Sequence, residues 1–230
     1  MIRRPGPSRS AVLLAVLAGA AAASGCAKRL ELKMTIDVLS EPGKADVEYR
    51  KKPIGAAPQR VNIDTFDDLE SIRASIADGQ VVEKRIRILS PETAQVIFRF
   101  AKEPSPLAKK LGAARLLVFE YSEKVSFDSN KSDLKPEALP ILNKQREILT
   151  TYFPNAKAYV CGYTDSTGKD DLNLKLSLDR ANAVANYLQA GGVEKSRLEP
   201  RGFGKEFPIE TNATPVGRAF NRRTEVVLPQ

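Results

Sequence analysis

Two kinds of hydrophobic periodicity follow one another along the sequence and meet at residues 104–115. Before this segment, apolar and polar residues alternate in short runs, as in 32–38, where every second residue is apolar. Alternation of this kind predicts strands with one buried face. After the segment, strand-like runs alternate with longer stretches that carry apolar stripes at helical spacing. We therefore predict an α+β protein with two domains, 32–103 and 116–230, joined by a linker that two prolines stiffen.

The first domain is predicted to be a small β-sandwich. Strand-like runs recur with turn-forming residues between them, at 32–38, 45–49, 61–63, 81–89 and 94–100. A single short helical candidate at 66–76 is compatible with a sandwich. Residues 40–49 and 52–58, with their turn sequence Glu-Pro-Gly and the pattern Lys-Pro-Ile-Gly-Ala-Ala-Pro, resemble the PEGA domain family. The order Glu-Pro-Gly and Lys52 depart from the family pattern. The resemblance implies an extracytoplasmic structural or interaction module without catalytic residues.

The second domain is predicted to place two helices on one mixed sheet. Its elements are a strand at 116–125, a helix at 136–152, a strand at 156–162, a helix at 172–190, and strands at 197–203 and 224–228. Pro136 suits the first turn of a helix, and Gly191 with Gly192 supplies a helix stop. This βαβαββ order is typical of helices packed against a sheet.

Residues 1–25 are predicted to be a lipoprotein signal peptide. Residues 1–9 carry three arginines and no acidic residue, and residues 11–23 are apolar. The apolar run is too short to cross a bilayer as a helix, which takes roughly 20 residues. Small residues then lead into Cys26, in a pattern that resembles a lipobox with Ala23 where leucine is usual.

Cys26 is therefore expected to carry lipid at the start of a short tether, 26–31. Acyl chains on this cysteine would anchor the chain stably in a membrane. Two alternatives are ordinary cleavage, which leaves a free thiol, and a disulfide between Cys26 and Cys161. A lipidated Cys26 would leave Cys161 as a lone, inert thiol.

The composition excludes several classes of function. The 230 residues include no histidine, which excludes catalysis by Ser-His-Asp or Cys-His groups and the zinc motifs that need histidine. A formal net charge of +8 would suit an anionic surface or polymer. Nucleic acid is not expected as a partner, because no basic stripe with interleaved aromatic residues occurs. We expect neither a cofactor nor a metal ion.

A run of small and polar residues links the predicted strand 156–162 to the predicted helix 172–190. It reads Gly162-Tyr-Thr-Asp-Ser-Thr-Gly168, then Asn173 and Leu176-Ser-Leu-Asp-Arg-Ala181. Further pieces are Phe127-Asp128, Gly202-Phe-Gly204, Pro208, Asn212 and Gly217-Arg-Ala-Phe-Asn-Arg-Arg223. In this order, the motifs are similar to those of OmpA-like peptidoglycan-binding domains, and the resemblance covers residues 116–230.

The resemblance implies a site for the peptidoglycan stem peptide. Diaminopimelate presents an ammonium and a carboxylate at one end, so a receptor needs an anion and a cation side by side. Asp165 can take the ammonium, and Arg180 can bind the carboxylate through two parallel hydrogen bonds, which lysine cannot do. The companions that the resemblance implies are Asp128, Thr164, Asn173 and Leu176. The alternative is that Asp165 and Arg180 pair only with each other and pin the loop to the helix.

Two positions depart from the family pattern. Tyr163 stands where histidine is usual, and Leu172 stands where tyrosine is common, which leaves the rim of the site and its pH response open. The arginines of residues 217–223 are expected to hold the C-terminal loop and strand, with contact to the glycan as the alternative.

The predicted function is a non-covalent tether between membrane and cell wall, without enzyme activity. The lipid is expected to lie in the outer membrane, with the protein facing the periplasm; the inner membrane is the alternative. One rival is an assembly adaptor whose first domain binds another envelope protein. A second rival is a wall-modifying enzyme that uses Asp128 and Asp165 as acid and base, but the chain shows no grouping of nucleophile and base to support it.

Overall fold

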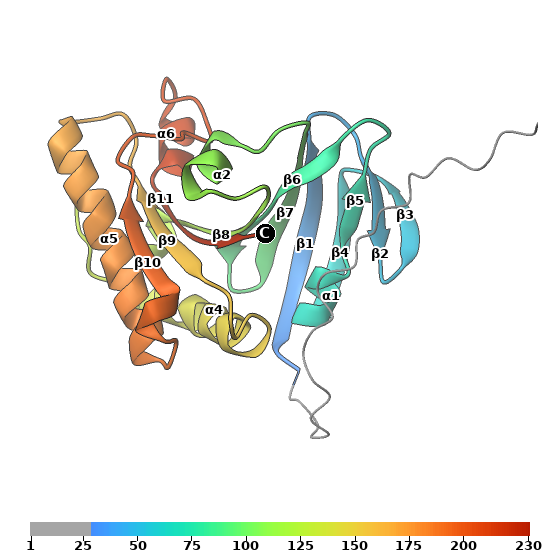
Figure 1. Ribbon diagram of the computed structural model, residues 1–230, viewed down its shortest axis with the longest axis horizontal. Helices are drawn as coiled ribbons and strands as arrows, with labels where there is room; N and C mark the ends of the chain where they lie inside the picture. The colour runs from blue at the N-terminus through green and yellow to red at the C-terminus, as the bar shows by residue number, and fades with distance from the viewer. Residues whose placement is uncertain (1–28) are drawn as a thin grey trace, which may run out of the picture.

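An eight-stranded mixed sheet runs through the chain in the computed structural model, which describes residues 29–230 (Figure 1). Its strands in spatial order are β10 (Leu198–Gly202), β9 (Ala158–Tyr163), β11 (Arg223–Pro229), β8 (Leu116–Ser122), β6 (Gln80–Ser90), β7 (Thr93–Ala101), β1 (Glu31–Glu41) and β4 (Gln59–Thr65). A second sheet has the order β3 (Lys52–Ala56), β2 (Asp46–Tyr49) and β5 (Arg73–Ser75). The α+β class is confirmed.

Helices fill the connections between these strands. They are α1 (Phe66–Glu70), α2 (Pro106–Leu111), α3 (Glu123–Ser126), α4 (Leu139–Thr151), α5 (Asp170–Ala190) and α6 (Pro215–Asn221), with 3-10 turns at Pro136–Ala138 and Lys195–Arg197. Among residues 29–230, no helix has the length and apolar composition that crossing a bilayer requires. The predicted signal peptide 1–25 and the lipid site Cys26 lie outside the described residues.

Strand β1 follows the predicted alternation. Met34, Ile36 and Val38 are buried, and the residues between them are less so, because successive side chains of a strand point to opposite faces. β1 pairs with β4 in antiparallel and with β7 in parallel orientation. Leu30 is already buried, so the predicted tether 26–31 ends before that residue.

The predicted N-terminal sandwich is present only in part. The small sheet packs on the large one: Val47 of β2 is buried in the same core as Ile36 of β1 and Ile63 of β4. The large sheet, however, does not end with the N-terminal half, because β6 pairs in parallel with β8 from Glu83 beside Leu116 onward. The N-terminal half therefore shares its larger sheet with the C-terminal half instead of closing on itself.

The segment 104–115, predicted to be a linker, contains a short helix that packs against the large sheet. This helix is α2, whose first turn is capped by the Ser105 hydroxyl and which ends at Gly112 in the left-handed conformation. Leu107 of α2 is 5% exposed and packs against the sheet. Pro104 and Pro106 are typical of a break between strands, but Ser105 followed by Pro106 is also typical of a helix start, and here a helix begins at Pro106.

A buried ion cluster, made of Glu83, Arg85, Glu120 and Glu225, joins the two halves. The Arg85 guanidinium lies 2.8 Å from the Glu83 carboxylate, 2.7 Å from that of Glu120, and also contacts Glu225. The four side chains are each at most 4% exposed. Arg85 therefore pairs with carboxylates on β6, β8 and β11, while Glu120 also pairs with Arg87 and Glu225 with Arg223.

The C-terminal half confirms the predicted βαβαββ order in β8, α4, β9, α5, β10 and β11. Helices α4 and α5 cover one face, where Leu149 and Leu188 join Val226 of β11 in the main core. Leu107 of α2 packs with Val227 on the other face. Neighbouring residues of β11 therefore pack into two separate cores, one on each face of the sheet. Packing on both faces holds the ends of the strands in fixed positions.

Candidate binding site

The loop after β9 is held against α5 by a very close backbone approach. A Cβ atom on Gly162 would lie 2.0 Å from the carbonyl oxygen of Ser177 in α5, so this position admits only glycine. The Ser177 hydroxyl in turn accepts a hydrogen bond of 2.9 Å from the amide of Gly204. The end of β9, the helix and the loop after β10 are thereby locked together, which positions Asp165.

Asp165 is a nearly buried carboxylate with two hydrogen-bond donors. Its Oδ1 accepts from the Thr167 amide at 2.8 Å, and its Oδ2 accepts from Nη1 of Arg222 at 2.7 Å. The side chain is 11% exposed. Burial raises the pKa of the Asp165 carboxyl, but the Thr167 amide and the Arg222 guanidinium outweigh it and hold the pKa below its usual value. The carboxylate is therefore charged at neutral pH.

Arg180 is a buried cation that the backbone holds in place. Its side chain is 1% exposed and forms an ion pair with Glu123. Nε donates to the carbonyl of Lys131 at 2.9 Å, and Nη2 donates to that of Asp128 at 3.3 Å. The guanidinium also lies 5.1 Å from the centre of the Phe127 ring. These hydrogen bonds use Nε and Nη2.

Asp165 and Arg180 are linked through two other charged residues. Glu123 contacts Arg180 through Oε1 and Arg222 through Oε2, and Arg222 continues to Asp165. We call Glu123, Asp165, Arg180 and Arg222 the four-charge network. Its charges balance, with two carboxylates and two guanidinium groups. Direct pairing of Asp165 with Arg180, the alternative considered from the sequence, is not what the structure shows.

Two members of this network were not predicted as binding residues. Arg222 belongs to the quoted motif 217–223 but was expected to hold the C-terminal strand, and Glu123 was not singled out. A signal existed in the topology: Ser122, Tyr163 and Arg223 are register partners in β8, β9 and β11. The residues beside them therefore meet at one end of these three neighbouring strands.

The predicted companions divide into two groups. Thr164 and Asn173 hold the loop: the Thr164 amide donates to the carbonyl of Gly204 at 2.8 Å, and Nδ2 of Asn173 donates to that of Thr167 at 2.8 Å. Leu176 is half-buried on α5, with no polar contact to the network. These three residues shape the site, and none supplies a charge.

Asp128 lies at the rim. Its carbonyl accepts from Arg180, whereas its carboxylate is 59% exposed and lies 3.3 Å from Lys131. An open hollow begins here and reaches the four-charge network. Its lining residues are Glu123, Phe127, Asp128, Ser129, Lys135, Ala219 and Arg222. Of the four-charge network, Glu123 and Arg222 line this hollow.

The other residues of the C-terminal motif have structural contacts. Arg223 is buried, donates to Glu225 at 2.8 Å and to the carbonyl of Phe207 at 2.9 Å, and lies 3.7 Å from the centre of the Tyr163 ring. Asn221 accepts from the amides of residues 209 and 210. Tyr163 is completely buried under Arg223, so the replacement of the family's histidine lies beneath the site and not at its rim.

Cys161 shares this buried environment. Its side chain has no exposed surface, and burial raises the pKa of its thiol far above the usual value. A buried, protonated thiol is a poor nucleophile. Cys161 is therefore an inert thiol, as predicted from the sequence.

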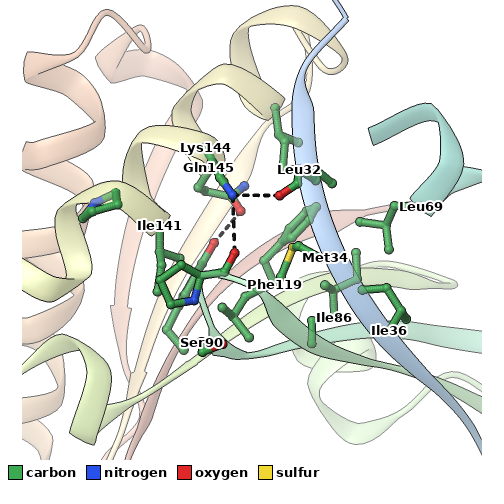
Figure 2. A pocket seen from close by; sticks show the side chains of 16 residues that line it. Leu32, Met34, Ile36, Leu69, Ile86, Ser90, Phe119, Ile141, Lys144 and Gln145 are labelled. Carbon is green, nitrogen blue, oxygen red and sulfur yellow. Dashed lines mark hydrogen bonds between the residues drawn. The ribbon is translucent and has the colours of Figure 1, made fainter. Parts of the chain in front are cut away.

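A second cavity lies between α4 and the large sheet (Figure 2). Its walls are almost entirely apolar, with Met34, Phe119 and Ile141 among them. Lys144 lies at its border and donates to the carbonyl of Leu32 at 3.1 Å. Among the described residues of this lining, Lys144 is the one charged residue and none carries a carboxylate, so the lining does not offer both charges that a zwitterionic ligand needs, and the cavity belongs to the packing between the two halves.

Comparison with known proteins finds a family match for the part of the chain that holds Asp165, Arg180 and Arg222. Residues 126–222 match the OmpA family. The probable lipoprotein YiaD of Escherichia coli strain K12 is 41% identical over 112 residues, which are 49% of this chain and 51% of YiaD. The peptidoglycan-binding protein ArfA of Mycobacterium bovis is 41% identical over 104 residues, which are 45% of this chain and 32% of ArfA.

Among solved structures, the cell wall anchor of the T6SS from Pseudomonas aeruginosa is 29% identical, with a TM-score of 0.45, and the match covers 49% of this chain and 80% of that one. The chain spans about half the length of YiaD and about a third of ArfA. The PEGA resemblance of residues 40–58 stays a prediction.

Proposed function

We propose, on the premise that residues 126–222 form an OmpA family domain, that this domain binds peptidoglycan without covalent chemistry. One observation carries the proposal: a nearly buried carboxylate, Asp165, and a buried guanidinium, Arg180, belong to one charge-balanced network beside an open hollow. A site of this kind suits a ligand that carries both charges. The name of the relative ArfA, a peptidoglycan-binding protein, supports the same polymer as ligand.

The ligand group proposed is the free end of diaminopimelate in the stem peptide. Its ammonium would bind the Asp165 carboxylate, and its carboxylate would bind the Arg180 guanidinium. Thr164 and Asn173 would keep the loop in position, and Asp128 would border the entrance. None of these steps makes or breaks a covalent bond.

The choice of stem peptide tests this assignment. A peptide with lysine in place of diaminopimelate keeps the ammonium but lacks the neighbouring carboxylate, so Arg180 gains nothing from it. We expect the diaminopimelate peptide to bind more tightly by about 1.5–3 kcal/mol, the usual contribution of a hydrogen bond to a charged group, because only this peptide has a carboxylate that can pair with Arg180. Isothermal titration with the two soluble peptides measures the difference. Equal affinities would show that no carboxylate is recognised.

We further propose that lipid on Cys26 anchors the chain, which would make it a tether between a membrane and the wall. The pattern of residues 1–26 and the name of the relative YiaD, a probable lipoprotein, support this proposal. The outer membrane is the proposed location, with the OmpA family domain in the periplasm.

Replacing Cys26 tests the anchor. The Cys26→Ala protein is expected to leave the membrane fraction and to collect in the soluble or precursor fraction, because no acyl acceptor remains at the cleavage site. Fractionation without detergent, followed by immunoblotting, measures this, and Cys161→Ala serves as the matched control. Membrane retention of a normally processed Cys26→Ala protein would exclude lipidation at this residue.

A further inference from the structure

We infer that Glu123 and Arg222 form an internal stand-in for the zwitterionic ligand, which the ligand displaces when it binds. The inference rests on the proposed function, since it concerns the same site. It adds that Glu123 and Arg222 compete with the ligand for Arg180 and Asp165. The affinity for the wall then depends on the exchange of one set of ion pairs for another.

The two stand-in residues carry the charges of the proposed ligand in the same places. The Glu123 carboxylate contacts Arg180, where the ligand carboxylate would bind. The Arg222 guanidinium lies 2.7 Å from Asp165, where the ligand ammonium would bind. Glu123 and Arg222 are also bonded to each other. One anion and one cation, joined together, thus occupy both ends of the site.

The stand-in residues are held less firmly than the two residues they cover. Arg180 is fixed by two backbone carbonyls and the Phe127 ring, and Asp165 by the Thr167 amide. Within residues 29–230, the side-chain polar contacts of Glu123 and Arg222 are confined to the network itself. The Arg222 side chain is also 34% exposed, against 1% for Arg180.

The stand-in pair can be reached from solvent. Glu123 and Arg222 both line the open hollow, together with Ala219 of α6. The exchange would leave no charge stranded, because Nε of Arg222 and Oε2 of Glu123 bond to each other and can remain paired. The ligand would take over the contacts to Arg180 and Asp165 at the same time.

Removing the stand-in is therefore expected to strengthen binding. In the double variant Glu123→Gln with Arg222→Gln, the unliganded site loses the two charges that pair with Asp165 and Arg180. Asp165 and Arg180 themselves stay charged and can bind the ligand. The net charge of the chain does not change, so long-range attraction to the wall polymer stays the same. We expect the full chain to bind the soluble diaminopimelate stem peptide about five- to tenfold more tightly, given the modest net contribution of an intramolecular hydrogen-bonded pair.

The matched control removes another ion pair without changing the net charge. Lys175 and Asp179 pair at 2.7 Å on the surface of α5, outside the network. The variant Lys175→Gln with Asp179→Asn should bind the peptide like the wild type. Titrations of the three proteins, each with an unfolding curve, make the comparison.

Single variants test the assignment of each charge. Arg222→Gln should strengthen binding of a lysine-type stem peptide, whose ammonium competes with Arg222, and Glu123→Gln should not. If the double variant does not fold, this pair of titrations decides. If the wild type binds the diaminopimelate peptide and the variants bind it equally or less tightly, the inference is overturned and the proposed function stands. A wild type that binds neither peptide would overturn both.

Discussion

Replacing Arg180 with alanine is expected to abolish measurable binding of the diaminopimelate stem peptide. The ligand carboxylate would lose its only proposed cationic partner in a site where Arg180 is 1% exposed. Truncating one partner of such a desolvated charge pair costs about 2–5 kcal/mol, which is roughly 30-fold to several thousandfold in affinity. Asp165→Ala should have a similar effect through the ammonium. Isothermal titration of the folded variants measures both losses.

Two comparisons separate recognition from general damage. Arg180→Lys keeps the charge but cannot make two parallel hydrogen bonds to a carboxylate, so it should also bind poorly. Arg201→Ala removes an arginine of the same domain that is 52% exposed and pairs with Glu199, and it should bind like the wild type. If folded Asp165→Ala and Arg180→Ala proteins keep wild-type affinity, the ligand is bound elsewhere.

The second large effect is expected in stability, from the Arg85→Met change in the buried ion cluster. Without Arg85, three buried carboxylates each lose a cation: Glu120 keeps Arg87 and Glu225 keeps Arg223, whereas the nearest remaining cation to Glu83 is Arg99 at 3.7 Å. Breaking a buried pair in this way costs about 3–5 kcal/mol, because an uncompensated charge stays buried. Chemical denaturation should show this loss in one cooperative transition, since the sheet is continuous from β6 to β8.

A surface pair provides the matched control for this change. Arg60 is 71% exposed and pairs with Asp37 at 2.6 Å, so Arg60→Met should change the free energy of unfolding by at most about 1 kcal/mol. Equal effects of the two substitutions would mean that the cluster does not join the halves. Two separate unfolding transitions in the wild type would restore the independent domains that the sequence suggested.

The dependence of stability on pH gives a second readout of the same cluster. Burial raises the pKa of Glu225, but the attraction of Arg85 and Arg223 outweighs burial, so that the pKa is lowered from 4.5 to about 2. A depressed folded-state pKa contributes stability that is present above 4.5 and is lost as the pH falls toward 2. In Arg85→Met the folded-state pKa of Glu225 should be higher, so less of this acid-sensitive stability remains to be lost.

Local patterns predicted the elements well and their long-range partners poorly. The alternation in β1 and the apolar stripe of α4 are properties of neighbouring residues, and both elements were found. The pairing of β6 with β8 depends on which strand edges meet after folding, and periodicity carries no information on that. Charged side chains in β6, such as Arg85, were consistent with a solvated face, although partners on β8 and β11 bury them.

The candidate site shows the same division. Asp165 and Arg180 were found because they lie in a motif of fixed order along the chain. Glu123 and Arg222 join them only through the ends of β8 and β11, which are far apart in the sequence. A search of the residues that flank paired strand ends would have pointed to Arg222, which stands immediately before β11.

Co-sedimentation with purified peptidoglycan sacculi tests the central proposal most directly. The full chain, the Asp165→Ala and Arg180→Ala variants and the Arg201→Ala control would be mixed with sacculi of the diaminopimelate type and centrifuged. We expect the wild type and the control to appear in the pellet, and the two site variants to stay in the supernatant. A wild type that stays in the supernatant, or site variants that sediment as it does, would contradict peptidoglycan binding through the Asp165 and Arg180 pair.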